Sequence, residues 1–219
     1  MGWQNIGAHK GHWLRGLAVV LMVAGLLISS MGGGGDARAK QHPALTFNLV
    51  RSATAETTGC LTKAKGTVKI FKLGFAEKMQ VAVSGLPKNT EFDVFVTQLP
   101  NTPFGISWYQ GDLESNDQGN AHGKFVGRFS IETFAVAPGP GPAPVVHDSG
   151  TIKDAATNPA FAPVHTYHVG VWFNSGQDAA NAGCANVITP FNGDHTAGPQ
   201  ALSTRQFADT AGPLRQLVP

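Results

Sequence analysis

The alternation of apolar and polar residues between Gly66 and Phe134 is the most regular feature of the chain and predicts a series of short β-strands. Strict period-two alternation is typical of antiparallel strands with one face on a core and the other towards water. Polar residues such as Gln80, Asp93 and Lys124 occupy the positions between the apolar ones, so we expect them to be exposed. The residues expected to face inward are Val81, Val83, Phe92, Val94, Val96, Phe125, Phe129 and Ile131.

Short polar turns such as LPKNT, LPNTPFG and SNDQGN separate the predicted strands. In the second strand the alternation shifts phase between Ile70 and Phe71, which predicts either a bulge or a strand covered on both faces. The strands are expected at residues 44–51, 67–73, 77–84, 91–99, 106–113, 125–134, 166–173 and 186–191, with a short helix at 177–182. Seven or eight short strands of this kind predict an all-β fold, an antiparallel β-sandwich that is immunoglobulin-like, or Greek-key, in the broad sense.

Two other segments define the expected domain organisation. Met1 to Arg15 is basic, Gly16 to Ile28 is apolar, and Ala37-Arg38-Ala39 is a small-x-small cleavage pattern. We therefore expect residues 1–39 to be a secretory signal peptide, or alternatively an uncleaved anchor, and the protein to be secreted or held at the cell surface. The Pro/Gly segment 137–144 is expected to be a long loop within a single domain of residues 40–219, with a domain linker as the alternative.

The charge balance limits the classes of partner. The full chain has 16 basic and 14 acidic residues, and removing residues 1–39 leaves 13 of each. A neutral chain without a basic run argues against nucleic acid and against an anionic membrane surface as partner. A membrane contact is expected only through the leader, if the leader is not cleaved.

The two cysteines, Cys60 and Cys184, both lie in the part expected to be exported. An even cysteine count in an oxidising compartment favours a single disulfide between them. The alternatives are two reduced buried thiols or half of a metal site.

Three strings resemble a group of uncharacterised exported bacterial β-rich proteins. They are GLPKNTEFDVFV, PFGISWYQGDL and VHTYHVGVWFN, which together sample most of the expected domain, and the PFGxxWYQGD string is the most distinctive. The resemblance implies secretion and a compact β-rich domain. It implies no activity and no site residues.

Histidine provides the main candidate for metal chemistry, because neutral imidazole is a common metal ligand. His165 and His168 are three positions apart, and residues with this spacing on a regular strand face opposite sides. Both could bind one ion only if the chain bends between residues 163 and 166. Loop carboxylates Asp148 and Asp194 could orient the ligands. The candidate ligands are His147, His165, His168 and His195.

A second candidate site combines Asp112 and Glu114 with Asn116, Asp117 and Asn120. Paired carboxylates suit general acid–base chemistry, and a loop of oxygen ligands suits calcium. The calcium-loop register fails because Asp117 occupies the position where glycine is required, so a solvated hairpin tip is the preferred interpretation.

Aromatic residues provide the candidate for ligand binding. In the pairs Trp108–Tyr109 and Trp172–Phe173, alternation buries one member and turns the other outward. Tyr109 and Trp172 could therefore line a face on which carbohydrate or peptide stacks. Nucleophile and phosphate-loop motifs are missing from the sequence, so we expect a non-enzymatic binding or structural module without a cofactor. The alternative function is a metal-dependent enzyme, or a metal-binding protein, that uses the histidine set.

Overall fold

The computed structural model describes residues 42–131, 164–189 and 197–218. It also describes the backbone of three short strands at 134–135, 147–148 and 151–152. Its helices are α1 (Ala53–Thr57), α2 (Gly176–Asn181) and the 3-10 helix η2 (Pro213–Gln216). Its strands are β1 (Leu45–Arg51), β2 (Lys65–Leu73), β3 (Ala76–Ser84), β4 (Glu91–Thr97), β5 (Ser107–Glu114), β6 (Ala121–Gly127), β7 (Phe134–Ala135), β8 (His147–Asp148), β9 (Thr151–Ile152), β10 (Val164–His165), β11 (His168–Phe173) and β12 (Gln200–Ser203).

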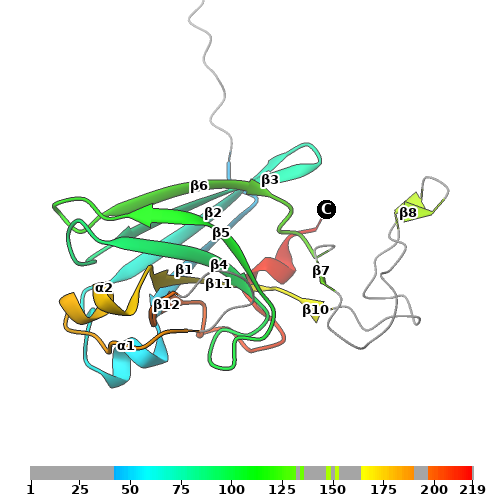
Figure 1. The fold of residues 1–219 in the computed structure, drawn as a ribbon. Helices are drawn as coiled ribbons and strands as arrows, with labels where there is room; N and C mark the ends of the chain where they lie inside the picture. The colour runs from blue at the N-terminus through cyan, green and yellow to red at the C-terminus, as the bar shows by residue number, and fades with distance from the viewer. Residues whose placement is uncertain are drawn as a thin grey trace, which may run out of the picture. The chain divides into compact units, whose positions relative to one another are not determined.

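Eight of the strands form one antiparallel sheet in the order β5-β4-β11-β12-β1-β2-β3-β6 (Figure 1). The end strands β5 and β6 contact each other, so the sheet is nearly closed. Strands β7 and β10, and β8 and β9, form two small sheets. The prediction of an antiparallel all-β fold is confirmed, whereas the finer description as an immunoglobulin-like sandwich is not.

The main core lies inside this curved sheet and is built from the alternating faces that the sequence predicted. Met79, Val81 and Val83 are at most 2% exposed, while Gln80 and Ala82 between them are only half-buried. Of the predicted inward set, Phe125 and Ile131 are half-buried and the other members are buried.

Two glycines allow the end strands to approach. A Cβ on Gly111 would lie 2.7 Å from the Phe125 ring, and a Cβ on Gly123 would also lie 2.7 Å from that ring. Gly111 has a φ of 146°, and the pairing of β4 with β5 skips Gln110 at this point. The Phe125 ring therefore occupies the seam between β5 and β6, where no other residue type leaves room for it.

Strand β4 differs from the prediction because both of its faces are buried. Asp93, which the alternation assigned to the exposed face, has no exposed surface. Its face of the sheet is covered by a second apolar cluster of Phe95, Trp172 and Ala197, with Phe104 packed against it. The cover comes from loop segments that carry no strand periodicity, so alternation alone did not reveal it.

Three further details of the strands can be compared with the prediction. The pairing of β2 with β1 and β3 runs without a bulge, and Phe71 is covered instead by Lys78, whose Nζ lies 4.8 Å from the ring centroid. Strand β6 ends at Gly127 because the next amides bond elsewhere; Phe129 N–H, for example, donates to Glu77 Oε2 at 2.8 Å. Residues 186–189 are not a strand, and the prediction missed β12 of the main sheet together with the two-residue strands β8, β9 and β10.

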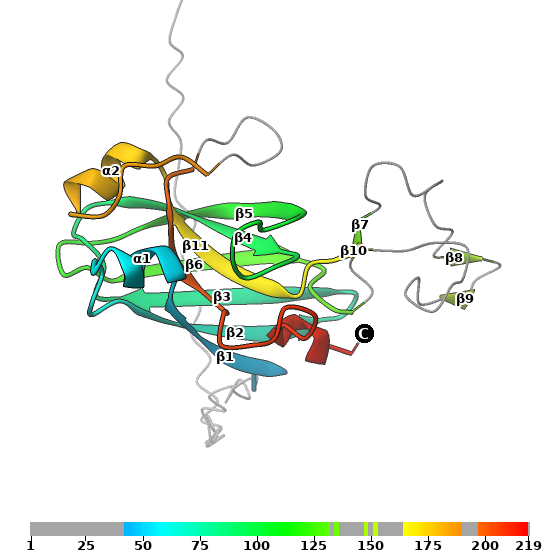
Figure 2. The ribbon, with the colours of Figure 1, turned by 90° about the horizontal axis from the view of Figure 1, so that it is seen from below.

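The predicted disulfide between Cys60 and Cys184 is present, with a Cα–Cα distance of 5.4 Å across 124 positions of sequence. Cys60 follows α1 and Cys184 follows α2, and the two helices lie at the same end of the described part (Figures 1 and 2). The bond thus links the first and last thirds of the domain. No helix among the described residues is long and apolar enough to cross a membrane.

Candidate functional site

An uncharged cleft of about 480 Å³ opens beside the loop that joins β4 to β5. Hydroxyl groups and apolar side chains line it together, and none of the described lining residues carries a charge. The residues that define it are Thr54 of α1, Thr102, Phe104 and Ser107 of the loop, Ile188, and Gln200 of β12. The cleft therefore presents hydrogen-bonding groups around an aromatic ring without a net charge.

The loop that carries Phe104 is fixed at its base by Gln98. The Gln98 N–H donates to Ile106 O at 2.8 Å, and Ile106 N–H donates to Gln98 Oε1 at 3.2 Å. Leu99 N–H donates to Phe104 O at 3.0 Å. Gly105 has a φ of 67°, and a Cβ there would lie 2.2 Å from Gln98 Oε1. The Pro103-Phe104-Gly105 turn thus needs its glycine to place the ring.

Phe104 is the first of four aromatic side chains that contact one another in series. The ring centroids of Phe104 and Trp172 are 5.0 Å apart and those of Trp172 and Phe95 are 5.4 Å apart, with the rings edge-on in both pairs. The Phe95 and Tyr109 rings are tilted, with 5.5 Å between their centroids. Trp172 has no exposed surface, and Tyr109 is 39% exposed. Neither of these two predicted ligand-binding residues lines the cleft. Trp172 instead holds the ring that does, because the outer face of β11 is covered rather than open.

Tyr109 has a separate hydrogen bond at the end of this chain. Its hydroxyl donates to the carboxylate of Asp112. Burial, followed by the hydrogen bond and charge of Asp112 and the charge of Asp93, raises the pKa of Tyr109 above its ordinary value of 10.0. Tyr109 therefore stays protonated near neutral pH and acts here as a hydrogen-bond donor.

Gln200 contributes a deeply buried amide to the wall of the cleft. The residue is 4% exposed, and its Nε2 has no hydrogen-bond partner among the described residues. A neighbouring hollow of about 370 Å³ shares Thr54, Phe104 and Gln200 with the cleft and adds Asn101, whose Oδ1 also lacks a partner within that part of the chain. Buried amide groups in native proteins are normally satisfied by protein, water or a ligand. Both atoms are buried in the walls of the two hollows rather than exposed in them.

The strand that carries Gln200 is held against α1. Ser52, the N-cap of α1, donates its hydroxyl to Gln200 O, and its N–H donates to Ala201 O at 3.0 Å. The same Ser52 hydroxyl accepts from Ala55 N–H at 3.0 Å, which begins the helix. One buried serine thus sets both the start of α1 and the position of β12, and with them two walls of the cleft.

The predicted histidine set is only partly within the described residues. The side chain of His147 and the whole of His195 lie outside them. His165 stacks on Tyr167 with 4.8 Å between ring centroids. No group of three or more His, Cys, Asp or Glu side chains in the described ranges is arranged to hold a metal ion. The four-histidine site remains a prediction.

His168 has a structural position. It has no exposed surface, its Nε2 lies 3.0 Å from Asp209 O, and its Nδ1 lies 2.9 Å from Thr204 Oγ1. A carbonyl can only accept, so Nε2 carries the proton and Nδ1 accepts from the Thr204 hydroxyl. Burial lowers the pKa of His168 below 6.5, although Asp209 opposes the shift. Both ring nitrogens are thus occupied in joining β11 to the C-terminal segment.

The turn between Asp112 and Asn120 is held by hydrogen bonds from backbone N–H groups to the Asn116 side chain. Asn116 Oδ1 accepts from Gln118 N–H and Asn120 N–H, each at 3.0 Å. Asp117 is exposed. Because the Asn116 oxygen is used by the turn itself, the arrangement is that of a solvated hairpin tip.

In comparisons with known proteins, no family model and no curated sequence matches the chain. Sequence reasoning missed Phe104 and Gln200. Phe104 lies in the distinctive PFG string, a signal that could have been followed, whereas nothing around Gln200 marks it in the sequence.

Proposed function

We propose that this is an exported, non-enzymatic binding module that holds a neutral carbohydrate in the cleft beside Phe104. The observation that carries the proposal is the combination of hydroxyl groups with the Phe104 ring in a cleft whose described lining residues carry no charge. A ligand with hydroxyl groups and an apolar ring face matches both kinds of lining.

The lining chemistry supports a sugar over other ligand classes. Sugars combine hydroxyl groups with an apolar ring face, and the cleft combines Thr102, Thr189 and Ser107 with the ring of Phe104. A cleft volume of about 480 Å³ lies within the range of roughly 300–1,000 Å³ found for small-molecule sites. A charged ligand would lose its hydration here without meeting an opposite charge.

The same lining supports binding over catalysis. Among the described residues that line the cleft, none is a His, Asp, Glu, Cys, Lys or Tyr. General acid–base and nucleophilic mechanisms require such a group within hydrogen-bond reach of the substrate. The hydroxyls of the cleft have no base beside them among its lining residues.

Export is supported by two independent features. The leader has the basic, apolar and small-x-small order of a signal peptide. The Cys60–Cys184 bond is of the kind that forms and persists in oxidising compartments. A sugar-binding module outside the cytoplasm agrees with both.

The test is calorimetric titration of the full chain with a panel of neutral oligosaccharides. Phe104→Ala should weaken binding at least tenfold, equivalent to about 1.4 kcal/mol. The matched control is Trp108→Ala, because Trp108 is 51% exposed on the neighbouring strand and does not line the cleft. Equal losses in the two variants, or binding of neutral peptides with no binding of sugars, would contradict the proposal.

A further inference from the structure

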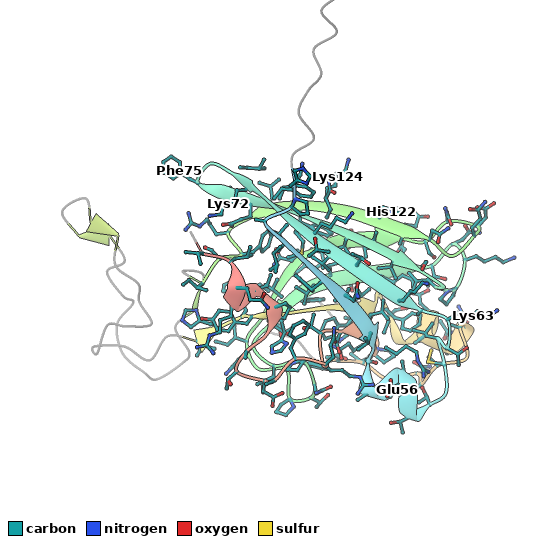
Figure 3. The ribbon with its side chains drawn as sticks, turned by 180° about the vertical axis from the view of Figure 1, so that it is seen from behind. Glu56, Lys63, Lys72, Phe75, His122 and Lys124 are labelled. Carbon is teal, nitrogen blue, oxygen red and sulfur yellow. A yellow bond between two sulfur atoms is a disulfide. The ribbon has the colours of Figure 1, made fainter. Side chains whose placement is uncertain are left out.

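The turn between β2 and β3 exposes an unusual amount of apolar surface. Phe75 at its tip is 90% exposed, Leu73 beside it is 42% exposed, and Val126 on the adjacent strand β6 is 69% exposed. Figure 3 shows the Phe75 side chain at the outer end of this hairpin. The Arg128 guanidinium donates to Phe75 O at 2.8 Å, so the tip is held in place. We call these three apolar residues the hairpin tip.

Lysines surround the hairpin tip on the outer face of β2, β3 and β6. The strand register places Lys69, Gln80 and Lys124 in one row across the three strands, and Lys78 and Val126 in the next row. Lys65 lies further along the same face of β2, and Lys72 lies close to the tip. The fold therefore gathers into one face lysines that are scattered along the sequence.

Among the described residues, the strands that form this face present no exposed acidic side chain beside Lys65, Lys69, Lys78 and Lys124. The four strands β1, β2, β3 and β6 contain one acidic residue, Glu77. Glu77 is 4% exposed, and its carboxylate accepts from Phe129 N–H inside the fold. Neutral overall charge argued against an anionic partner, but the strand register gathers Lys65, Lys69, Lys78 and Lys124 on one face, where the described strands expose no acidic side chain.

We propose that the hairpin tip and the lysines around it bind an anionic phospholipid surface. An exposed aromatic and two aliphatic side chains can enter the boundary between headgroups and acyl chains, where apolar burial is favourable. Each lysine close to an anionic surface adds to the attraction. A soluble polyanion would use the lysines but would leave Phe75 in water.

The position of the hairpin agrees with docking through the tip. In Figure 1 this hairpin projects from the side of the sheet opposite α1, which lines the cleft. A protein docked by the tip would leave the cleft open to water.

The experiment places an environment-sensitive fluorophore at the tip. The chain has two cysteines and both are in the disulfide, so Phe75→Cys can be labelled at one site in the full chain. Vesicles of phosphatidylcholine with 30–40% phosphatidylglycerol, roughly the anionic content of a charged membrane, are compared with phosphatidylcholine alone. We expect a blue shift with the anionic vesicles only. The control label at Gln177→Cys on α2 should not shift with either.

Variants of the full chain separate insertion from charge attraction. Phe75→Ala should weaken binding to the anionic vesicles about tenfold or more. Lys69→Gln and Lys124→Gln should each weaken it about fivefold. Trp108→Ala, an exposed aromatic away from this face, should leave it unchanged. A label at position 75 that stays in water, or lysine variants that lose binding while Phe75→Ala keeps it, would overturn the proposal in favour of a soluble polyanion.

Discussion

Truncation of Phe92 tests whether the predicted inward face of β4 supports the domain. Phe92 has no exposed surface, and its ring lies 4.8 Å from that of Phe173 on the adjacent strand. Phe92→Ala removes a fully buried ring from between strands that are paired on both sides, so the cavity cannot collapse easily. We expect a loss of ~3–5 kcal/mol in the free energy of unfolding.

Urea denaturation under non-reducing conditions measures this loss. With a denaturant dependence of ~1–3 kcal/mol per molar urea, the midpoint should fall by about 1 M or more. Lys124→Ala on the exposed face of β6 is the matched control and should stay within about 0.5 kcal/mol.

A third variant tests the covered outer face of β4. Asp93→Ala should cost ~1–3 kcal/mol, because Asp93 has no exposed surface and loses its buried interactions. A loss below 1 kcal/mol for Phe92→Ala, or a loss at Lys124 comparable to that at Phe92, would refute the assignment of the two faces. An unchanged stability in Asp93→Ala would refute the cover over β4.

Three further predictions concern the disulfide, pH and export. Reduction of the Cys60–Cys184 bond should lower the free energy of unfolding by up to about 5 kcal/mol, the chain-entropy value for so long a loop, and an unchanged melting temperature in reductant would contradict this. His168 has a pKa below 6.5 in the folded state, so its contribution to stability is present above pH 6.5 and is lost as the pH falls below that value. His168→Gln should therefore make the free energy of unfolding fall less steeply with decreasing pH. The same pH dependence in the variant and the original protein would rule the assignment out. N-terminal sequencing of exported protein should begin at or near Lys40, whereas intact Met1 in the membrane fraction would support the anchor.

Alternation along the chain was sufficient to predict the strands that face the main core. Val81 and Val83 are inward because a period of two fixes the face of every second residue once one face is buried. It was insufficient for Asp93 and Trp172, whose burial depends on loop segments that fold back over the outer face of β4 and β11. Strand β12 was missed because only four residues form it and none alternates in burial.

The cleft was beyond prediction for a related reason. Phe104 and Gln200 are 96 positions apart in the sequence and meet because β4, which leads into the Phe104 loop, and β12 both pair with β11. The hairpin tip left a clearer signal, since Phe75 is an aromatic residue next to Gly74 in a turn. The proposal that the hairpin tip binds lipid also depends on lysines that only the strand register brings to one face.

Backbone chemical-shift mapping with neutral oligosaccharides tests the binding site most directly. The account predicts that amide signals of Phe104, Gly105, Ser107 and Gln200 move with a common saturable dependence on sugar concentration, while signals of β2 and β3 stay in place. Shifts confined to the outer face of β2 and β3, or no shift at any of the four cleft amides, would contradict a carbohydrate site beside Phe104.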